Sequence, residues 1–437
     1  MSRGRLLRRR GLHGRAPVRV ALTAAIALSA SVAVTASVSA QPTNPTGVIR
    51  IGALLSITGG GSSLGNTSKA ALEVARDQWN QRLARQRRNL RVELDIVDTG
   101  QDPTRATAGF QQLADQRVRV IIGPQSSSEV AAIQPLANAR GVLIVSQGST
   151  ASSLAMPDNN LFRFVPNDHV EGRATTDLLV QQGARVVVPM WRNDRGNQGL
   201  ADSVRAAATS GGVQVTAGFR YEPGTTDFGP GLNEISRQVT AAVGQVGAAH
   251  VAVYLAGFEE VAGVLAAADQ VPGLAGMRWY GGDGSAQAVQ LLERGSANFA
   301  IKAKGFPSPL VALPNDRAKR DTALIQQIAR RAHATPDAFA LAAYDAFDVA
   351  AQTLLSTGTS VDSQTLRIAF AKTANGYAGV TGTIKLDSTG DRASAPYAYW
   401  SICQGRDRHP HWVRSGAWTP QAADPTGPGT VTGGHCS

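Results

Sequence analysis

Residues 118–130 read VRVIIGPQSSSEV, and they indicate the fold more clearly than any other stretch. A β-branched run of strand length, 118–123, stops at a Gly-Pro step. Three serines and a glutamate follow, which is how a strand passes into the start of a helix. Residues 142–150, VLIVSQGST, repeat the arrangement one step further along the chain. Strands that alternate with helices in this way predict a parallel sheet.

The same alternation extends outward from these two stretches. Further strands are expected at 48–55 and 92–98, with helical patterns between them. The alternation then repeats, with strands predicted at 185–190, 213–219, 250–255 and 277–281, helices at about 198–210 and 231–246, and a long amphipathic helix at 338–356. Two successive α/β sheets predict two Rossmann-like lobes, each with a parallel central sheet covered by helices on both faces.

The composition fits a folded protein of more than one domain. The chain has 437 residues, of which 43% are hydrophobic and 17% are charged, so packed cores are expected and global disorder is not. The net charge is +11, but residues 1–40 hold seven Arg and no acid. The remaining excess of four carries no basic run interleaved with aromatics, so neither nucleic-acid binding nor a membrane-binding stripe is expected.

The first forty residues predict a secretory signal peptide. An Arg-rich start precedes a run of small apolar residues from Val18 to about Val38, and the stretch ends in Val38-Ser39-Ala40. Cleavage near Ala40 is expected, with a retained membrane anchor as the alternative. The protein is therefore expected outside the cytoplasm, in the periplasm or at the cell surface. The route, general secretory or twin-arginine, stays open, and no Cys lies near Ala40 to carry a lipid.

Two cysteines, Cys403 and Cys436, lie close to the C-terminus. In an exported chain an even number of cysteines favours a disulfide. The alternative is a metal site with His409, His411 or His435, but the spacing matches no zinc pattern. Residues 403–437 are rich in Pro and Gly, and a loose tail is expected there.

The polar residues that follow two of the first-lobe strands predict a binding site. Ligands in open α/β sheets lie beyond the carboxyl ends of the strands. There the chain presents Ser126 and Ser127 after one strand and Gly148, Ser149 and Thr150 after the next. Unpaired N–H groups at helix N-termini favour an anion such as a carboxylate. Ordinary N-capping is the competing interpretation.

Seven short motifs follow one another along the chain: Ile51–Gly59, Gly123–Ser128, Pro135–Ala137, Gly141–Ser146, Phe162–Pro166, Gly281–Gly284 and Ala343–Ala346. In this order they resemble the periplasmic Leu/Ile/Val-binding protein family of ABC importers. The likeness runs from about Val48 to Ile402.

The resemblance implies the type I periplasmic binding protein fold, in which three crossovers join two discontinuous lobes. The crossovers are expected at 162–167, 281–285 and about 357–363. The first lobe would then comprise 48–165 and 285–357, and the second 166–280 and 358–402. Residues 1–40 and 403–437 would lie outside both lobes.

The resemblance also assigns roles to residues. It places a ligand carboxylate on Ser127, Gly148 and Thr150, and the ligand's ammonium on Asp283. A carboxylate that faces an amine in a closed cleft is strong in both charge and hydrogen bonding. Asp283 is one carbon shorter than the family's Glu, and a simple turn residue is the alternative there.

Other expected contacts shape the rest of the site. Phe258 would cover the ligand, and Leu64 and Phe339 would shape its side-chain pocket, with core packing as the alternative for all three. The family's other second-lobe aromatic is missing, and Arg195 or Gly196 stands in its place. Arg195 would recognise a second anionic group or point to solvent.

The resulting hypothesis is a monomeric receptor of an ABC importer that closes over a small amino acid and presents it to a membrane permease. Alternatives are a receptor of the same fold for a non-amine carboxylate, amide or aromatic acid, and a secreted sensor or hydrolase. Ser127 is not in a Gly-x-Ser-x-Gly elbow, and His169, His250 and His333 lie in no triad or metal motif, so catalysis, a metal and a cofactor are not expected.

Overall fold

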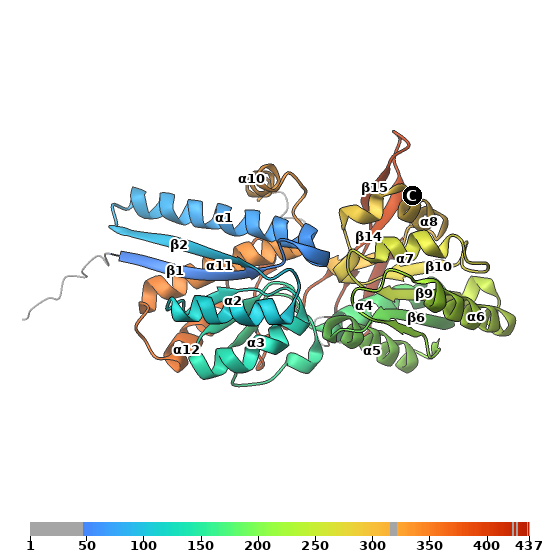
Figure 1. Cartoon of the computed structure of the whole chain (residues 1–437), viewed down its shortest axis with the longest axis horizontal. Coiled ribbons are helices and arrows are strands. Elements are labelled where there is room, and N and C mark those ends of the chain that lie inside the picture. The colour runs from blue at the N-terminus through green and yellow to red at the C-terminus, as the bar shows by residue number, and fades with distance from the viewer. Residues whose placement is uncertain (1–46, 315–320, 422–423, 425–426, 435, 437) are drawn as a thin grey trace, which may run out of the picture. The chain divides into compact units, whose positions relative to one another are not determined.

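The computed structural model describes residues 47–314, 321–421, 424, 427–434 and 436 (Figure 1). The predicted signal peptide and its cleavage point near Ala40 lie outside the described residues. In the described part of the chain, no helix combines the length and the apolarity that crossing a membrane requires.

The first lobe is built on a five-stranded parallel sheet. Its strands are β1 (Gly47–Leu55), β2 (Leu90–Asp98), β3 (Val120–Ile122), β4 (Leu143–Ser146) and β5 (Leu161–Arg163), in the order β2-β1-β3-β4-β5. Every neighbouring pair is parallel. The predicted parallel sheet is therefore confirmed, and β1 lies inside it because its side chains are apolar on both faces.

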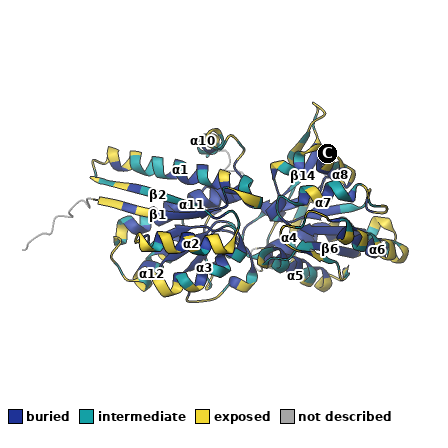
Figure 2. Cartoon of the chain, viewed as in Figure 1, coloured by how far each residue is buried: buried dark blue, intermediate teal, exposed yellow. Residues whose placement is uncertain are grey.

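Four helices cover the two faces of this sheet (Figure 1). They are α1 (Ser62–Arg85) and α11 (Ala338–Thr357) on one face, and α2 (Pro103–Asp115) and α3 (Ser127–Arg140) on the other. Alternation along β1 decides the contacts, since Ile51 and Ala53 join the α1 and α11 side whereas Leu54 joins the α2 and α3 side. Figure 2 shows the buried inner surfaces that result.

The second lobe repeats the plan. Its sheet contains β6 (Val186–Arg192), β7 (Gln214–Val215), β8 (Phe219–Tyr221), β9 (Val251–Ala256) and β10 (Arg278–Gly281). The order is β10-β9-β6-β7, with β8 also on β6. One face is covered by α4 (Asp168–Gln181) and α5 (Arg195–Ser210), the other by α6 (Gly229–Val246) and α7 (Val261–Ala268).

The strand predicted at 213–219 is divided in two. Gly218 between the two pieces has φ of +75°, and a Cβ there would lie 2.2 Å from the carbonyl oxygen of Pro189. A positive φ ends the extended conformation, so β7 and β8 pair with different parts of β6.

The second crossover lies later than predicted. The chain was expected to return to the first lobe from residue 285, yet α8 (Arg294–Lys302) packs on α7 of the second lobe. The ring of Phe299 on α8 meets that of Trp279 edge-on, with 5.3 Å between the ring centroids. The apolar face of α8 is buried in the core of the second lobe, which keeps this segment there. The chain reaches the first lobe only after β11 (Ser308–Val311), where α10 (Thr322–Ala332) packs on α1.

The third crossover also lies later than the predicted 357–363. Helix α12 (Ser363–Ala374) packs on α11, and Phe370 lies 4.7 Å from Phe162 between ring centroids. Its buried Leu366 and Phe370 hold it to the first lobe. The short strands β12 (Ala378–Gly379) and β13 (Gly382–Thr383) follow before the chain returns. Single turns of 3-10 helix complete the fold at Gly59–Gly61, Ser152–Leu154, Ala248–His250, Asp283–Ser285 and Val289–Leu292.

The loose tail predicted at 403–437 is wrong, because residues 403–404, 410–419 and 430–433 belong to β-strands. Strands β14 (Tyr397–Gln404), β15 (Pro410–Thr419) and β16 (Thr430–Gly433) form a four-stranded sheet with β11, antiparallel throughout. Trp418 on β15 is fully buried, and its indole N–H donates to Asp177 of α4 at 2.8 Å. Pairing with β14 and burial of this indole outweigh the Pro- and Gly-rich composition.

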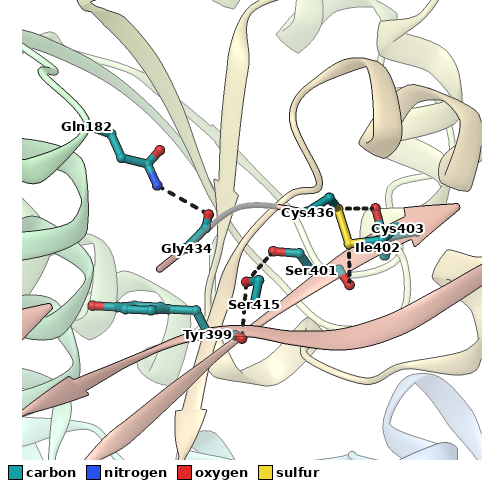
Figure 3. The surroundings of a disulfide bond; sticks show 8 residues. All are labelled: Gln182, Tyr399, Ser401, Ile402, Cys403, Ser415, Gly434 and Cys436. Atoms are coloured by element: carbon teal, nitrogen blue, oxygen red, sulfur yellow. Dashed lines mark hydrogen bonds between the residues drawn. A yellow bond between two sulfur atoms is a disulfide. The ribbon is translucent and has the colours of Figure 1, made fainter. Parts of the chain in front are cut away.

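A disulfide joins Cys403 and Cys436 (Figure 3). Nearby, Gln182 donates to the carbonyl of Gly434 at 3.2 Å, and the hydroxyls of Ser401 and Ser415 share a hydrogen bond of 2.7 Å. The end of the chain is thereby fastened to β14 and α4. No described group of His, Cys, Asp or Glu has the arrangement of a metal site, and His435 lies outside the described residues.

The first and third crossovers meet at a buried ion pair. The guanidinium of Arg163 on β5 donates to both carboxylate oxygens of Asp391, and both side chains are at most 1% exposed. The same guanidinium donates to the carbonyls of Ser149 at 3.3 Å and Ala151 at 2.8 Å. Backbone hydrogen bonds from Arg163 to Gly390 and from Arg392 to Arg163 run alongside.

Replacing Asp391 by Ala leaves the Arg163 charge buried without its partner. We expect the free energy of unfolding to fall by about 3–5 kcal/mol. Urea denaturation measures it. The matched control is Asp115→Ala, which removes the exposed partner of Arg140 and should cause no measurable change. Equal losses in the two variants would contradict a structural role for the buried pair.

Candidate functional site

Two first-lobe loops meet through one serine. Ser146 at the end of β4 donates its hydroxyl to the carbonyl of Pro124 at 2.6 Å and accepts from the N–H of Ser149 at 2.9 Å. Ser127, in the first turn of α3, shares a hydrogen bond of 3.0 Å with Ser149 and accepts from the N–H of Ala151 at 3.2 Å. The hydroxyl-rich segments after β3 and β4 are therefore bonded to each other, as the parallel sheet predicts.

Gly148 belongs to the second of these loops and has no room for a side chain. A Cβ at this position would lie 2.4 Å from Cγ of Gln125 and 3.3 Å from the ring of Phe339. The backbone of the loop therefore comes close to both neighbours, which only glycine permits.

These loops line a narrow, partly open cavity of about 20 Å³. Seven of the predicted ligand-binding residues line it, from both lobes: Ser126, Ser127, Gly148, Thr150, Phe258, Asp283 and Phe339. Sequence reasoning missed four further lining residues, which are Gln125, Asn197, Leu200 and Gly284.

The three remaining predicted residues do not line the cavity. Leu64 is buried in the core of the first lobe, and Ser149 lies fully buried behind Ser127. Arg195 is exposed, and its guanidinium donates to the hydroxyl of Ser153 at 3.2 Å. Of the two residues considered for the missing aromatic, Gly196 therefore lines the cavity.

The first turn of α5 explains why Asn197 and Leu200 were missed. This helix was predicted to begin near 198, but it begins at Arg195, because Asp194 accepts from the N–H groups of Gly196 and Asn197 at 3.0 Å each. Asp194 is a strong N-cap residue, and this signal was available in the sequence.

Phe258 is held in place by a neighbouring cation. The guanidinium of Arg192 lies 5.1 Å from the centroid of the Phe258 ring. Arg192 itself pairs with Asp194 at 3.1 Å and with Glu260 at 3.5 Å. The cation above the ring fixes its orientation toward the cavity.

Hydrogen bonds join the two lobes at the N-terminus of α1. Glu259 of the second lobe accepts from the N–H of Ser63 at 2.8 Å and from the hydroxyl of Ser62 at 3.3 Å. It also accepts from Gln290 at 2.7 Å, and Ser63 donates to Gln290 at 3.1 Å. A carboxylate at the N-terminus of α1 is favoured by the helix dipole, so these contacts stabilise the closed arrangement.

Three carboxyl groups gather on the second-lobe side of the cavity. Asp283 keeps part of its surface exposed, whereas Asp168 and Glu171 in the first turn of α4 are fully buried. Burial raises the pKa of Asp168 to about 7 and that of Asp283 to about 6. Burial, reinforced by the charges of Asp283 and Asp168, raises the pKa of Glu171 well above its usual range. From sequence, the two α4 acids are indistinguishable from ordinary first-turn acids.

Two parallel α/β lobes, three chain crossings and a cavity lined from both lobes define a solute-binding receptor of type I periplasmic binding architecture. The family described as periplasmic binding protein matches residues 48–405. The chain therefore belongs to the periplasmic binding protein family.

Relatives and solved structures agree with this assignment. An uncharacterized protein of Methanocaldococcus jannaschii is 28% identical over 397 residues, which cover 87% of this chain and 92% of the relative. A leucine-binding protein of Thermotoga maritima superposes with a TM-score of 0.66 at 21% identity, covering 84% of this chain and 97% of its own. A solute-binding protein of R. palustris in complex with benzoate reaches 0.67 at 19% identity, with 84% and 96% covered.

The buried carboxyl of Asp168 predicts a stability that depends on pH. Since its pKa is raised to about 7 in the folded protein, the folded state holds a proton that the unfolded chain releases at lower pH. The stability this group contributes is present in acid and is lost as pH rises through about 7. Asp168→Asn should therefore raise the free energy of unfolding at pH 8 by about 1–3 kcal/mol relative to the parent.

The measurement is thermal melting of both proteins between pH 5 and pH 8. The difference should shrink toward pH 5, where the parent carboxyl is neutral. A difference that stays constant across this range would show that the charge of Asp168 is not the cause.

Proposed function

We propose that this protein is the extracytoplasmic receptor of an ABC importer and binds an α-amino acid in the cavity. One observation carries the proposal: the same cavity holds hydroxyl and N–H donors from the first lobe and a carboxyl from the second. A free amino acid is a zwitterion and needs both. A ligand that carries only one of these charges would leave the polar groups at one end of the cavity without a partner.

The ligand carboxylate would bind at the first-lobe loops. Ser127 and Thr150 offer hydroxyls and Gly148 an N–H, and all three line the cavity. The N-terminus of α3 adds the positive end of its helix dipole. The ligand's ammonium would pair with Asp283, and Phe258 and Phe339 would enclose the side chain.

Transport would depend on closure of the lobes. The three crossovers act as the hinge, and the contacts of Glu259 with Ser62 and Ser63 hold the closed form that a permease would recognise. Closure excludes water and strengthens the polar contacts inside. The family acts with ABC permeases, and the leucine-binding relative is consistent with an amino acid as cargo. We infer a monomer and a binding role without catalysis, since the hydroxyl of Ser127 contacts Ser149 and the N–H of Ala151 rather than a histidine.

A second candidate is a receptor for an aromatic acid. Two phenylalanines, Phe258 and Phe339, line the cavity, and the solved structure from R. palustris holds benzoate. Such a ligand would use the first-lobe donors and stack on the rings, but would bring no cation to Asp283. The two candidates therefore differ in what neutralises this carboxyl.

Thermal melting of the purified protein with a ligand panel tests the proposed function. The panel contains L-leucine, L-isoleucine, L-valine, L-threonine, L-alanine and benzoate. A ligand at 100 times its dissociation constant adds about 2.7 kcal/mol, a shift of several degrees. We expect the shift with an amino acid. Ser127→Ala should weaken its binding about tenfold to a hundredfold, because a hydrogen bond to a charged group is lost.

The matched control for this variant is Ser236→Ala, whose hydroxyl donates to Pro272 on the surface of α6. It should bind as the parent does. A shift with benzoate alone would favour the second candidate. No shift with any member of the panel would contradict the proposed function.

Glu259→Ala tests the closure contacts. Loss of the hydrogen bonds from Ser62 and Ser63 should raise the ligand dissociation rate roughly tenfold and leave the association rate nearly unchanged. Stopped-flow tryptophan fluorescence measures both rates. Glu234→Ala, which removes a partly exposed carboxylate on α6, is the control. A slower association with an unchanged dissociation rate would contradict a closing role for Glu259.

A further inference from the structure

The carboxyl of Glu171 lies directly behind Asp283. The backbone N–H of Asp283 donates to Oε1 of Glu171 at 3.0 Å. Oε2 of Glu171 has no hydrogen-bond partner among the described residues, although the side chain is fully buried. Glu171 does not itself line the cavity, so any effect it has on a ligand passes through Asp283.

The groups that face this pair are another acid and two phenols, and the charge of Arg163 acts on that acid. Asp168 comes from the same helix, Tyr254 from β9 and Tyr397 from β14, and both phenols feel the charges of all three acids. Neither phenol oxygen has a hydrogen-bond partner in the described part of the chain, and the same holds for both carboxylate oxygens of Asp168. Buried polar groups left open in this way need a compensating proton or cation.

The basic residues nearby are already bound elsewhere. Arg163 is taken by Asp391 and two carbonyls, and Arg173 pairs with Asp177. Arg392 donates to Thr381 and to the carbonyl of Phe164. Among the described residues, none of the three acids has an ion pair with Lys, Arg or His. The compensation must therefore come from protons or from a ligand.

We propose that Glu171 and Asp283 form a carboxyl pair that shares one proton. When the primary ammonium of a ligand binds beside Asp283, both carboxyls ionise and the shared proton is released to solvent. This deepens the proposed function and rests on it. Before binding, one carboxyl is protonated and bonds to the other as carboxylate. The ammonium then lies against Asp283, the shared O–H bond breaks, and its proton leaves for the solvent. Two adjacent buried carboxyls keep a proton because both cannot ionise without a cation.

The sign of the proton exchange identifies the ligand class. An ammonium stabilises the ionised pair, so its binding expels a proton. An anion without an amine would stabilise the neutral pair and would take up a proton. In this scheme Glu171 is a positioning residue, since it determines whether Asp283 holds a proton and does not touch the ligand itself. Burial raises the pKa of Asp283 and that of Glu171 above the usual range of a carboxyl, so the pair keeps a proton at a pH where free carboxyls are ionised.

Isothermal titration calorimetry with L-leucine at pH 6.5 tests this inference on the unaltered protein. Titrations in phosphate and in Tris, whose ionisation enthalpies differ, give the number of protons exchanged. We expect the release of roughly 0.3–1 proton, and a dissociation constant that weakens about tenfold from pH 7.5 to pH 5.5. If L-leucine gives no heat, the same two-buffer titration is made with L-alanine, L-valine, L-isoleucine and L-threonine.

Glu171→Gln removes the second titrating group while it keeps an oxygen for the N–H of Asp283. It should still bind the amino acid but release less than half as many protons, with a flatter pH profile. Glu129→Gln is the matched control. Glu129 is likewise a fully buried first-turn glutamate whose pKa burial raises to about 7, but it lies on α3 and does not line the cavity. It should release as many protons as the parent.

The outcomes separate the two proposals. If an amino acid binds with no proton exchange or with proton uptake, the carboxyl-pair inference is wrong and the proposed function stands. If Glu171→Gln binds and releases protons as the parent does, Glu171 is not the second member of the pair. If no amino acid of the panel binds, the proposed function fails, and the inference fails with it.

Discussion

The guanidinium of Arg163 is the contact on which the site and the hinge both depend. It is fully buried, and it satisfies its charge with Asp391 and its remaining donors with the carbonyls of Ser149 and Ala151. A buried guanidinium is costly unless every donor is used, so the three segments that supply these acceptors are fixed together. They are the first crossover, the third crossover and the loop after β4. Because the carbonyls of Ser149 and Ala151 point to Arg163, the position of Thr150 between them is set, and it lines the cavity.

The two lobes contribute opposite chemistry to that cavity. The first lobe supplies hydroxyls and the N-terminus of α3, which are donors, and its loops are bonded to each other through Ser146. The second lobe supplies Asp283, backed by Glu171 and Asp168, and an aromatic ring fixed by Arg192. Such a division means that neither lobe alone offers a complete set of partners to a zwitterion. Binding and closure are then parts of one equilibrium, because the ligand's second charge is satisfied only when the lobes meet.

The sequence predicted local features well and long-range ones poorly. The parallel strands, the start of α3 after β3, and the lining residues Ser126, Ser127, Gly148 and Thr150 follow from patterns within a few residues of each other. Phe258, Asp283 and Phe339 came from the resemblance to the family, and the helix expected after β4 is a single 3-10 turn at Ser152–Leu154. The return points of the chain do not, because α8 and α12 have apolar faces that fit either lobe, and only Trp279 and Phe162 in the folded protein decide where they pack. The predicted loose tail is wrong for a related reason, since β15 is stabilised by Trp418 and Asp177, 241 residues apart. Glu171 was missed because burial, and not its position on a helix, makes it unusual.

Charge compensation in the second lobe explains how one fold serves different ligands. The relatives with solved structures include a leucine-binding protein and a protein that holds benzoate. First-lobe donors suit the carboxylate of either ligand, so they cannot distinguish them. The distinction must come from the groups that meet the rest of the ligand. In this chain those groups include Asp283, whose backbone N–H donates to the carboxyl of Glu171. A ligand without a cation would have to leave protons on both, while an amine satisfies them with its own charge. In the proposed scheme, selectivity depends less on the shape of the cavity than on the number of protons that the second lobe retains.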